Sequence, residues 1–130
     1  MLLADSSAWV EHLRGADSDV AFALLDSIEQ HEVSVIDPVV LEVMAGAHAG
    51  AVGRTQRVLE AQHFETLEPW RDFLSAATIY RELRRRGITI RSQMDAVIAA
   101  VAIRLDTPVL HRDRDFDVIA LHTSLQIVTV

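Results

Sequence analysis

Short apolar runs alternate along the chain with longer segments in which apolar residues recur every three or four positions. Short runs are typical of buried strands, and the longer period is typical of amphipathic helices. The pattern predicts strands at residues 2–4, 33–36, 64–67, 108–111 and 126–130. It predicts helices between them at residues 7–14, 17–30, 38–47, 50–62, 69–86 and 92–105.

Three of these helices begin with a recognisable start signal. Pro38 and Pro69 stand at first-turn positions, and Ser92 stands where a helix N-cap is expected. Alternating strands and helices predict an α/β fold with a parallel sheet of about five strands covered on both faces by helices. We expect one domain over residues 1–130, because no linker or repeat divides the chain. A ligand site is expected beyond the carboxyl ends of the strands, where strand order reverses.

Composition indicates a protein with a real core and no cysteine chemistry. Half of the residues are hydrophobic and none is cysteine, so disulfides and thiolate zinc sites are excluded. The N-terminus lacks a basic region and reaches an acid at Asp5, unlike a signal peptide. No apolar run approaches the roughly 18 residues that cross a bilayer. We therefore expect a soluble cytoplasmic protein without a membrane partner.

The net charge of −7 argues at first against a nucleic-acid partner. Distribution matters more than the total, however, since all twelve basic residues are arginines and five of them lie within residues 81–91. Two divalent cations bound by acidic side chains would raise the net charge by four, from −7 to −3. The acidic total is therefore compatible with an RNA substrate, although it does not predict one.

Four acids stand in or beside apolar sequence, where a carboxylate is costly unless it is paired or bound to a cation. Asp5 and Asp113 follow predicted strands, whereas Glu42 and Asp95 lie within apolar stretches of predicted helices. Asp5 and Asp113 therefore fall at the carboxyl ends of strands. Asp95 falls in a first helical turn, where the helix dipole favours negative charge. Oxygen ligands without His or Cys suit hard cations such as Mg²⁺ or Mn²⁺.

Each acid taken alone also has a purely structural interpretation. Asp5 could cap the following helix, and Asp95 could complement a helix dipole. Glu42 could lie on a narrow exposed stripe of its helix or pair with an arginine. Any one of them is more simply explained in this way. The four together, at the edge of one predicted sheet, favour a shared metal site.

The ordered motifs carry a family resemblance that spans essentially the whole chain. The segments Leu3–Val10, Val40–Glu42, Met94–Ala99 and Leu110–Phe116 together resemble the PIN-domain family. They look most like its VapC branch, the toxin half of bacterial type II toxin–antitoxin pairs. The ordered set of acids that ends in Asp-x-Asp-Phe is more specific than any single motif.

The resemblance implies a three-layer α/β/α fold and Mg²⁺- or Mn²⁺-dependent endoribonuclease activity. It also implies a cognate antitoxin encoded nearby and a homodimer. By position, Asp5, Glu42, Asp95 and Asp113 would be the four family acids.

Three further residues match supporting positions of the family. Asp115 matches an auxiliary acid, so the expected metal ligands are Asp5, Asp95, Asp113 and Asp115, whereas Glu42 would ligate a second metal or orient the attacking water. Ser7 matches the hydroxyl residue that supports the first aspartate. His111 departs from the family, which commonly has Thr or Ser there, and we expect it to support Asp113 or to pack at the edge of the sheet.

Two other groups of residues have open interpretations. Arg84, Arg85, Arg86 and Arg91 could bind RNA phosphates. Those at the end of the predicted helix, Arg81 and Arg84 to Arg86, could equally form an ordinary solvated helix end. Phe22, Leu25 and Val20 of the second predicted helix, with Leu13 of the first, could form a dimer face, although the core is the simpler interpretation.

Other functions remain possible on the sequence alone. One is an interaction module without catalysis, and another is a PIN-type RNA-processing nuclease that is not a toxin. Phosphotransfer proteins also place an aspartate after the first strand. They need a lysine late in the chain, and this chain has none.

Overall fold

The computed structural model describes all of residues 1–130 and contains one parallel sheet of four short strands. The strands run in the spatial order β3-β2-β1-β4, and each neighbouring pair is parallel. Leu2 of β1 pairs with Val33 of β2, and Leu3 of β1 pairs with Val109 of β4. The strand bounds are β1 (Leu2–Ala4), β2 (Val33–Val35), β3 (His63–Phe64) and β4 (Val109–Leu110).

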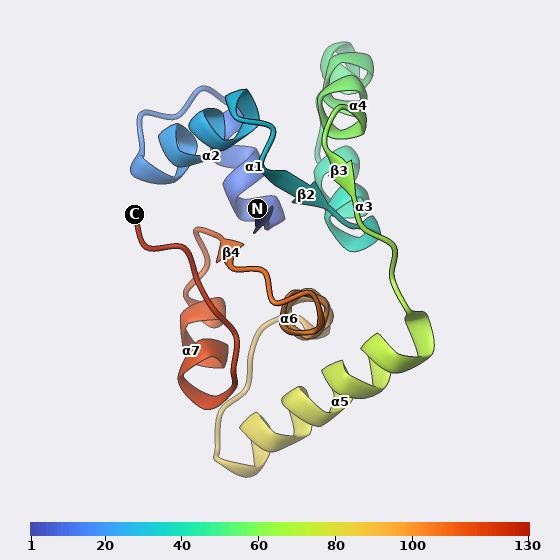
Figure 1. Cartoon of the computed structure of the whole chain (residues 1–130), viewed down its shortest axis with the longest axis vertical. Helices are drawn as coiled ribbons and strands as arrows, with labels where there is room; N and C mark the ends of the chain where they lie inside the picture. The colour runs from blue at the N-terminus through green and yellow to red at the C-terminus, as the bar shows by residue number, and fades with distance from the viewer.

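Seven α-helices and one 3₁₀ turn connect and cover the strands (Figure 1). Helices α1 and α2 lie on one side of the sheet, and α5 and α6 lie on the other. The bounds are α1 (Ser6–Leu13), α2 (Asp19–Glu29), α3 (Asp37–Ala45), η1 (Ala49–Ala51), α4 (Val52–Glu60), α5 (Pro69–Arg85), α6 (Gln93–Arg104) and α7 (Arg114–His122). The predicted three-layer α/β/α architecture is confirmed.

Strand order reverses between β1 and β4, and this fixes where a site can form. The chain passes from β1 outward to β2 and β3, then crosses the sheet to β4 on the other side of β1. Connections after β1 and β4 therefore diverge to opposite faces and leave a crevice beyond their carboxyl ends. Asp5 and Asp113 stand just beyond those two ends.

Helix α6 is the most deeply buried helix of the fold. Every residue from Asp95 to Ala102 is buried, and four of these residues are alanines. Small side chains let α5 and the sheet approach closely, and α5 and α6 pack together over much of their lengths. The first turn of α6 is thereby fixed at the crevice between β1 and β4.

Two strands predicted from the sequence differ from those in the structure. The segment 126–130 forms a single parallel bridge, between Val109 and Ile127, instead of a fifth strand. Because β4 is only two residues long, it offers little backbone for further pairing. The strand expected at 64–67 is His63–Phe64, and the chain then leaves the sheet to reach Pro69 at the start of α5.

Helix α7 was not predicted, because the charged segment after β4 was interpreted only as a site motif. Asp113 caps this helix, and its side chain accepts a hydrogen bond from the amide of Asp115 at 3.0 Å. Phe116 and Ile119, three residues apart, are fully buried on its inner face. A capping acid followed by this apolar spacing was a helix signal in the sequence. In addition, the helix expected at 50–62 is divided into η1 and α4.

None of the helices is both long and apolar enough to cross a membrane.

An ion pair between α5 and α6 is the most buried charge pair in the fold. Arg104 donates to both oxygens of Asp72, at 2.8 and 2.9 Å, and the amide of Glu68 donates to Asp72 at 2.8 Å. Burial alone would raise the pKa of the Asp72 carboxyl, but these hydrogen bonds and the charge of Arg104 hold its pKa below the ordinary value. Asp72, only 1% exposed, depends on this partner to remain charged.

Replacing Arg104 with Met should therefore destabilise the protein by about 3–5 kcal/mol near neutral pH, because it leaves a buried carboxylate unpaired. We expect a melting temperature lower by on the order of 10 °C. The pKa of Asp72 is lowered in the folded protein, so the stabilisation is lost as pH falls through that pKa, and the difference should shrink in acid. The control is Arg85→Met, which breaks an exposed pair with Glu82 and should cost less than about 1 kcal/mol. Equal losses in the two variants would contradict a special role for the buried pair.

Candidate active site

The predicted acids meet in an open cleft of about 400 Å³ beyond the carboxyl ends of β1 and β4. Four elements supply its walls: the start of α1, helix α3, the loop before α6 with its first turn, and the end of β4. The lining residues are Asp5, Ser6, Ser7, Val10, Glu42, Arg91, Ser92, Asp95 and Asp113. The structure thus brings together the four acids that the sequence singled out.

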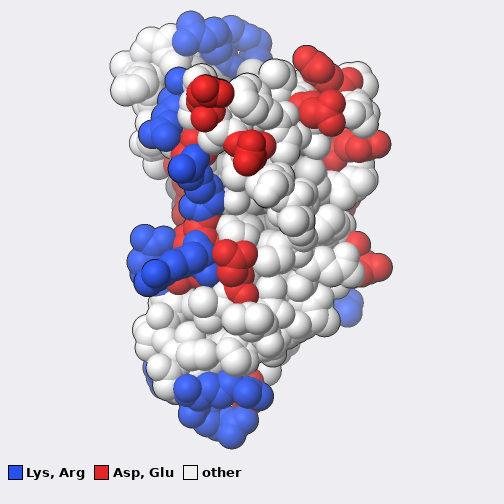
Figure 2. Space-filling view, turned by 90° about the vertical axis from the view of Figure 1, so that its left-hand side faces the viewer, with Lys and Arg blue, Asp and Glu red and all other residues white.

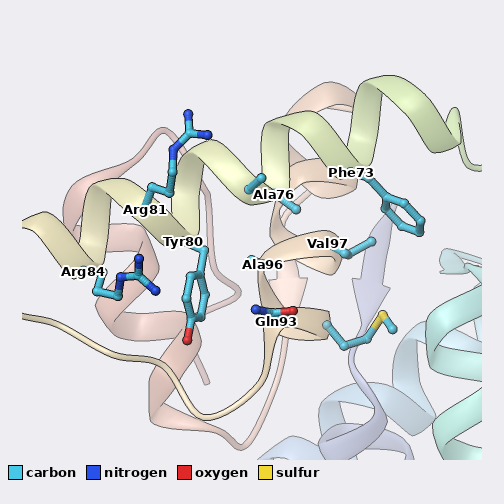
Figure 3. A pocket seen from close by; sticks show the side chains of 10 residues that line it. Phe73, Ala76, Tyr80, Arg81, Arg84, Gln93, Ala96 and Val97 are labelled. Carbon is cyan, nitrogen blue, oxygen red and sulfur yellow. The ribbon is translucent and has the colours of Figure 1, made fainter.

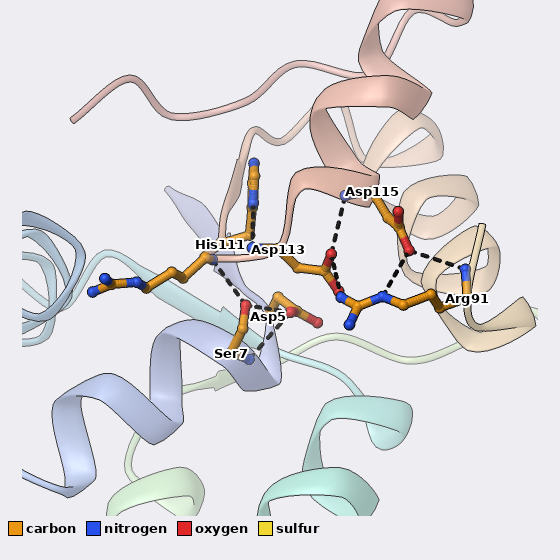
Figure 4. Close-up of polar contacts among 7 residues, drawn as sticks. Asp5, Ser7, Arg91, His111, Asp113 and Asp115 are labelled. Carbon is orange, nitrogen blue, oxygen red and sulfur yellow. Dashed lines mark hydrogen bonds and ion pairs between the residues drawn. The ribbon is translucent and has the colours of Figure 1, made fainter.

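Asp5 is buried and caps α1 (Figure 4). Its Oδ2 accepts hydrogen bonds from the amide of Ser7 at 3.1 Å and from the Ser7 hydroxyl at 2.6 Å. Its Oδ1 is buried without any hydrogen-bond partner. Capping therefore uses one oxygen and leaves the other free, so the structural and metal-binding interpretations of Asp5 are compatible.

Ser7 joins the two strand ends that form the cleft. Its hydroxyl donates to Asp5 and accepts a hydrogen bond from the amide of Arg112 at 2.9 Å. The guanidinium of Arg112 in turn reaches Glu11 of α1 at 3.2 Å. The contact expected between Ser7 and the first aspartate is present, and it also ties α1 to the segment after β4.

Asp113 is positioned by the residues that flank it. Its amide donates to Nδ1 of His111 at 3.0 Å, and its Oδ1 accepts from the amide of Asp115 at 3.0 Å (Figure 4). Nε2 of His111 lies 3.2 Å from Oδ1 of Asp117, and its ring contacts Phe116. The imidazole thus contacts the main chain of Asp113, at a position where the family commonly has Thr or Ser. Asp117, which the sequence did not single out, holds the far side of that ring.

Asp95, in the first turn of α6, has the most strongly raised pKa among the acids of the cleft. It is only 6% exposed. Burial, and then the negative charges of Asp5, Asp113, Glu42 and Asp115, raise its pKa to about 7. Carboxylate oxygens of Asp95, Asp113 and Asp115 lie within 4.8 Å of one another. Such a cluster is poorly compatible with full ionisation unless a cation is present.

Glu42 lies on the α3 side of the cleft and differs from the other acids. Although it stands in an apolar stretch of sequence, Glu42 itself is exposed, as is its neighbour Leu41. Of the interpretations that the sequence left open, an exposed stripe of the helix is therefore the one that the structure shows. Partial burial and the charges of Asp5 and Asp113 still raise its pKa, and a hydrogen bond with Ser6 offsets part of this rise. Glu42 faces the same charges from across the cleft.

The structure separates the arginines that the sequence grouped. Arg91 lies in the cleft, where it pairs with Asp113 and Asp115. Arg85 and Arg86 pair with Glu82 on the exposed end of α5, outside the cleft lining. Figure 2, which faces the left-hand side of Figure 1, shows Arg side chains next to Asp and Glu side chains on the surface.

Arg84 lines a second hollow, of about 470 Å³, between α5 and α6 (Figure 3). Its guanidinium lies over the ring of Tyr80, 5.9 Å from the centroid. Arg81 joins it at this hollow, and most of the other lining residues are apolar. The hollow extends to Gln93 and Met94 at the start of α6. These two residues lie in sequence between Ser92 and Asp95, which line the acidic cleft.

The donor set of the cleft fits a hard divalent cation. It consists of carboxylate oxygens and serine hydroxyls, which suit Mg²⁺ or Mn²⁺ better than softer metals. The unpartnered Oδ1 of Asp5 is a buried acceptor that needs a cation or a donor. Burial and the neighbouring carboxylates raise the pKa of Asp95, and a cation beside these acids would offset their mutual repulsion.

A family model described as the PIN domain matches residues 2–121, and this chain belongs to the PIN-domain family. Among its relatives, the VapC ribonuclease Mb1587 of Mycobacterium bovis and ribonuclease VapC11 of Mycobacterium tuberculosis are each 40% identical to it over 129 residues. The aligned part covers 97% of this chain and 96% of each relative.

A crystal structure of VapBC2 from Rickettsia felis, bound to a DNA fragment from their promoter, has a similar fold. The TM-score is 0.73 at 15% sequence identity, with 98% of this chain and 96% of the other chain covered. This likeness confirms the architecture.

Asp95→Asn should stabilise the metal-free protein above neutral pH. The folded-state pKa of about 7 lies above the ordinary 3.8, so the wild type loses stability as pH rises between these values. Each pKa unit corresponds to about 1.4 kcal/mol, so we expect a gain on the order of 2 kcal/mol or more at pH 8 in EDTA, and little gain at pH 4. Millimolar Mg²⁺ should raise the melting temperature of the wild type more than that of the variant.

The matched control is Asp19→Asn, an exposed aspartate in the first turn of α2 next to its N-cap Ser18. Loss of its favourable dipole interaction should cost about 0.3–1 kcal/mol without any Mg²⁺ effect. Thermal melting across pH, with EDTA and with Mg²⁺, tests both variants. Identical Mg²⁺ shifts in wild type and Asp95→Asn would show that Asp95 does not contribute to a metal site.

Proposed function

We propose that this chain is a Mg²⁺- or Mn²⁺-dependent endoribonuclease and the toxin of a VapBC-type toxin–antitoxin pair, folded as one domain over residues 1–130. The observation that carries the proposal is the convergence of Asp5, Asp95, Asp113 and Asp115 at the reversal of strand order. Identity of 40% to ribonucleases along nearly the whole chain supports the same activity.

The acids of the cleft would hold the metal, and each has a support that fixes its direction. Asp5 offers its free Oδ1 while Ser7 holds Oδ2, and Asp113 is held by its own helix cap and by His111. Asp95 and Asp115 complete the proposed ligand set. A bound Mg²⁺ or Mn²⁺ supplies charge neutralisation at the phosphate and an activated water.

Glu42 is suited to act on the attacking water, because its side chain is exposed, it faces the other acids and its pKa is raised. A carboxylate in that position can orient an attacking water and accept its proton.

Arginines near the cleft would hold the RNA backbone. Arg91 is within the cleft, and Arg84, Arg85 and Arg86 lie at the end of α5 where a longer substrate would pass. Guanidinium groups match phosphate geometry and can bind it through two hydrogen bonds. Two of the three arginines on α5 already pair with Glu82, so RNA would have to compete with these exposed, weak ion pairs.

An antitoxin partner and a homodimer both need apolar surface, and this chain exposes such surface on α1 and α2. Val10, Leu13, Phe22 and Leu25 are each at least 40% exposed. The core interpretation is therefore wrong for Leu13, Phe22 and Leu25, and it holds for Val20, which is buried. Exposed apolar patches of this kind commonly mark protein interfaces.

The proposed setting is the cytoplasm, where RNA substrate and antitoxin are available.

Asp95→Asn should reduce RNA cleavage by about a hundredfold or more, because it removes one charge from the acid cluster with little change in shape. EDTA should stop cleavage by the wild type. Mg²⁺ or Mn²⁺ should restore it, whereas Ca²⁺ should support it poorly because it prefers looser coordination. The measurement is cleavage of end-labelled cellular RNA by purified proteins, with Asp19→Asn as the fully active control. Full cleavage in EDTA, or by Asp95→Asn, would contradict the metal mechanism.

Expression of this chain alone should inhibit growth, and co-expression with a short reading frame encoded next to it should relieve the inhibition. The two proteins should also co-purify. Inhibition should disappear with Asp95→Asn, which separates ribonuclease toxicity from the burden of expression. A nuclease that is active in vitro but neither toxic nor bound by its neighbour would instead be an RNA-processing enzyme. Metal binding without cleavage of any RNA would favour the silent interaction module.

A further inference from the structure

One positive charge stands inside the acidic cleft. Arg91 lies in the loop between α5 and α6, directly before the N-cap Ser92. One of its guanidinium nitrogens is 2.8 Å from Oδ1 of Asp113, and its Nε is 3.4 Å from Oδ2 of Asp115. Its backbone amide also donates to Oδ2 of Asp115 at 3.0 Å. The side chain therefore spans two carboxylates of the cleft (Figure 4).

These two carboxylates belong to the group of three that could hold a cation. Oxygens of Asp95, Asp113 and Asp115 lie within 4.8 Å of one another. Arg91 already contacts one carboxylate oxygen of Asp113 and one of Asp115. A divalent ion bound by this group would therefore share two of its carboxylate ligands with a guanidinium. Two cations this close repel one another, and the interaction is only partly screened in a cleft with buried walls.

The arginine is the partner that is free to move. Its side chain is 76% exposed, whereas those of Asp113 and Asp115 are 16% and 12% exposed. Both acids are held by the first turn of α7, because Asp113 caps that helix through the amide of Asp115. A long, exposed side chain can change rotamer at little cost, but a helix cap cannot shift without loosening α7.

We propose that Arg91 is a built-in counter-cation, which pairs with Asp113 and Asp115 in the metal-free protein and competes with the divalent metal for them. This inference rests on the proposed function, since it requires that these acids take a metal. Arg91 lowers the metal affinity of the site and stabilises the metal-free fold. When the metal binds, the guanidinium is released at the wall of the cleft, where a phosphate is its matching ligand.

A purely structural clamp makes the opposite prediction for metal affinity. If Arg91 served only to pre-arrange Asp113 and Asp115, its removal would misplace these ligands and weaken metal binding. If it competes, its removal strengthens metal binding while lowering the stability of the metal-free protein. The sign of the change therefore distinguishes the two roles.

The first test is calorimetric titration of Mn²⁺ into wild type, Arg91→Ala and Arg114→Ala. Arg114 is a matched control, because it is exposed beside the same acids in sequence but forms no ion pair with them. We expect Mn²⁺ to bind Arg91→Ala about tenfold more tightly than wild type, and Arg114→Ala to change by less than about threefold. Arg91→Lys keeps the charge but cannot bridge two carboxylates in the same way, so an intermediate affinity is expected.

The second test follows the wild-type protein and does not depend on how a variant folds. The Nε–H signal of Arg91 in a ¹⁵N correlation spectrum should shift as Mg²⁺ is added, with the same midpoint as metal binding. Tighter Mn²⁺ binding by Arg91→Ala together with this shift supports the proposal. Unchanged or weaker binding by Arg91→Ala, or an Nε–H signal unaffected by saturating Mg²⁺, overturns it while leaving the metal-dependent function intact. Absence of metal binding by the wild type would overturn both.

Discussion

Five carboxylates gathered around one cleft repel one another, and the surrounding elements have to balance that repulsion before any metal arrives. Asp5 and Asp113 do so by capping helices, so their charges are met by backbone amides at the positive ends of α1 and α7. Asp95 sits in the first turn of α6, and its raised pKa leaves it partly protonated near neutral pH. Arg91 places one positive charge against Asp113 and Asp115.

Helix capping and metal binding are often treated as alternative explanations for an acid at a strand end, yet a carboxylate has two oxygens. Oδ2 of Asp5 accepts two hydrogen bonds from Ser7, and Oδ1 is left buried and unpaired. The cap fixes the direction of the free oxygen, because the side chain cannot rotate without breaking the bonds on the other side. Local helix formation therefore orients the group that the site needs.

The sequence predicted the alternation of strands and helices and the acids that would meet, because both depend on local pattern and on the topology that pattern implies. It did not predict contacts that depend on how distant segments pack. The apolar neighbours of Glu42 in sequence left open whether it is buried or lies on an exposed stripe, and only the packing of α3, which leaves Leu41 and Glu42 exposed, decides this. Helix α7 was missed because its charges matched a site motif, although Asp113, Phe116 and Ile119 had the spacing of a capped helix.

The packing of helix α6 in the core fixes the position of one acid of the cleft. Its N-terminal turn carries Asp95, and its last residue, Arg104, is held by Asp72 of α5 in the most buried ion pair of the fold. The residues from Ala96 to Ala102 are buried and include four alanines, so α6 has little room to slide or rotate against its neighbours. A change that shifts α6 at the Arg104 end would move Asp95 relative to Asp5 and Asp113. Since a compact divalent ion tolerates only small errors in ligand position, the proposed metal site would depend on packing along the entire helix.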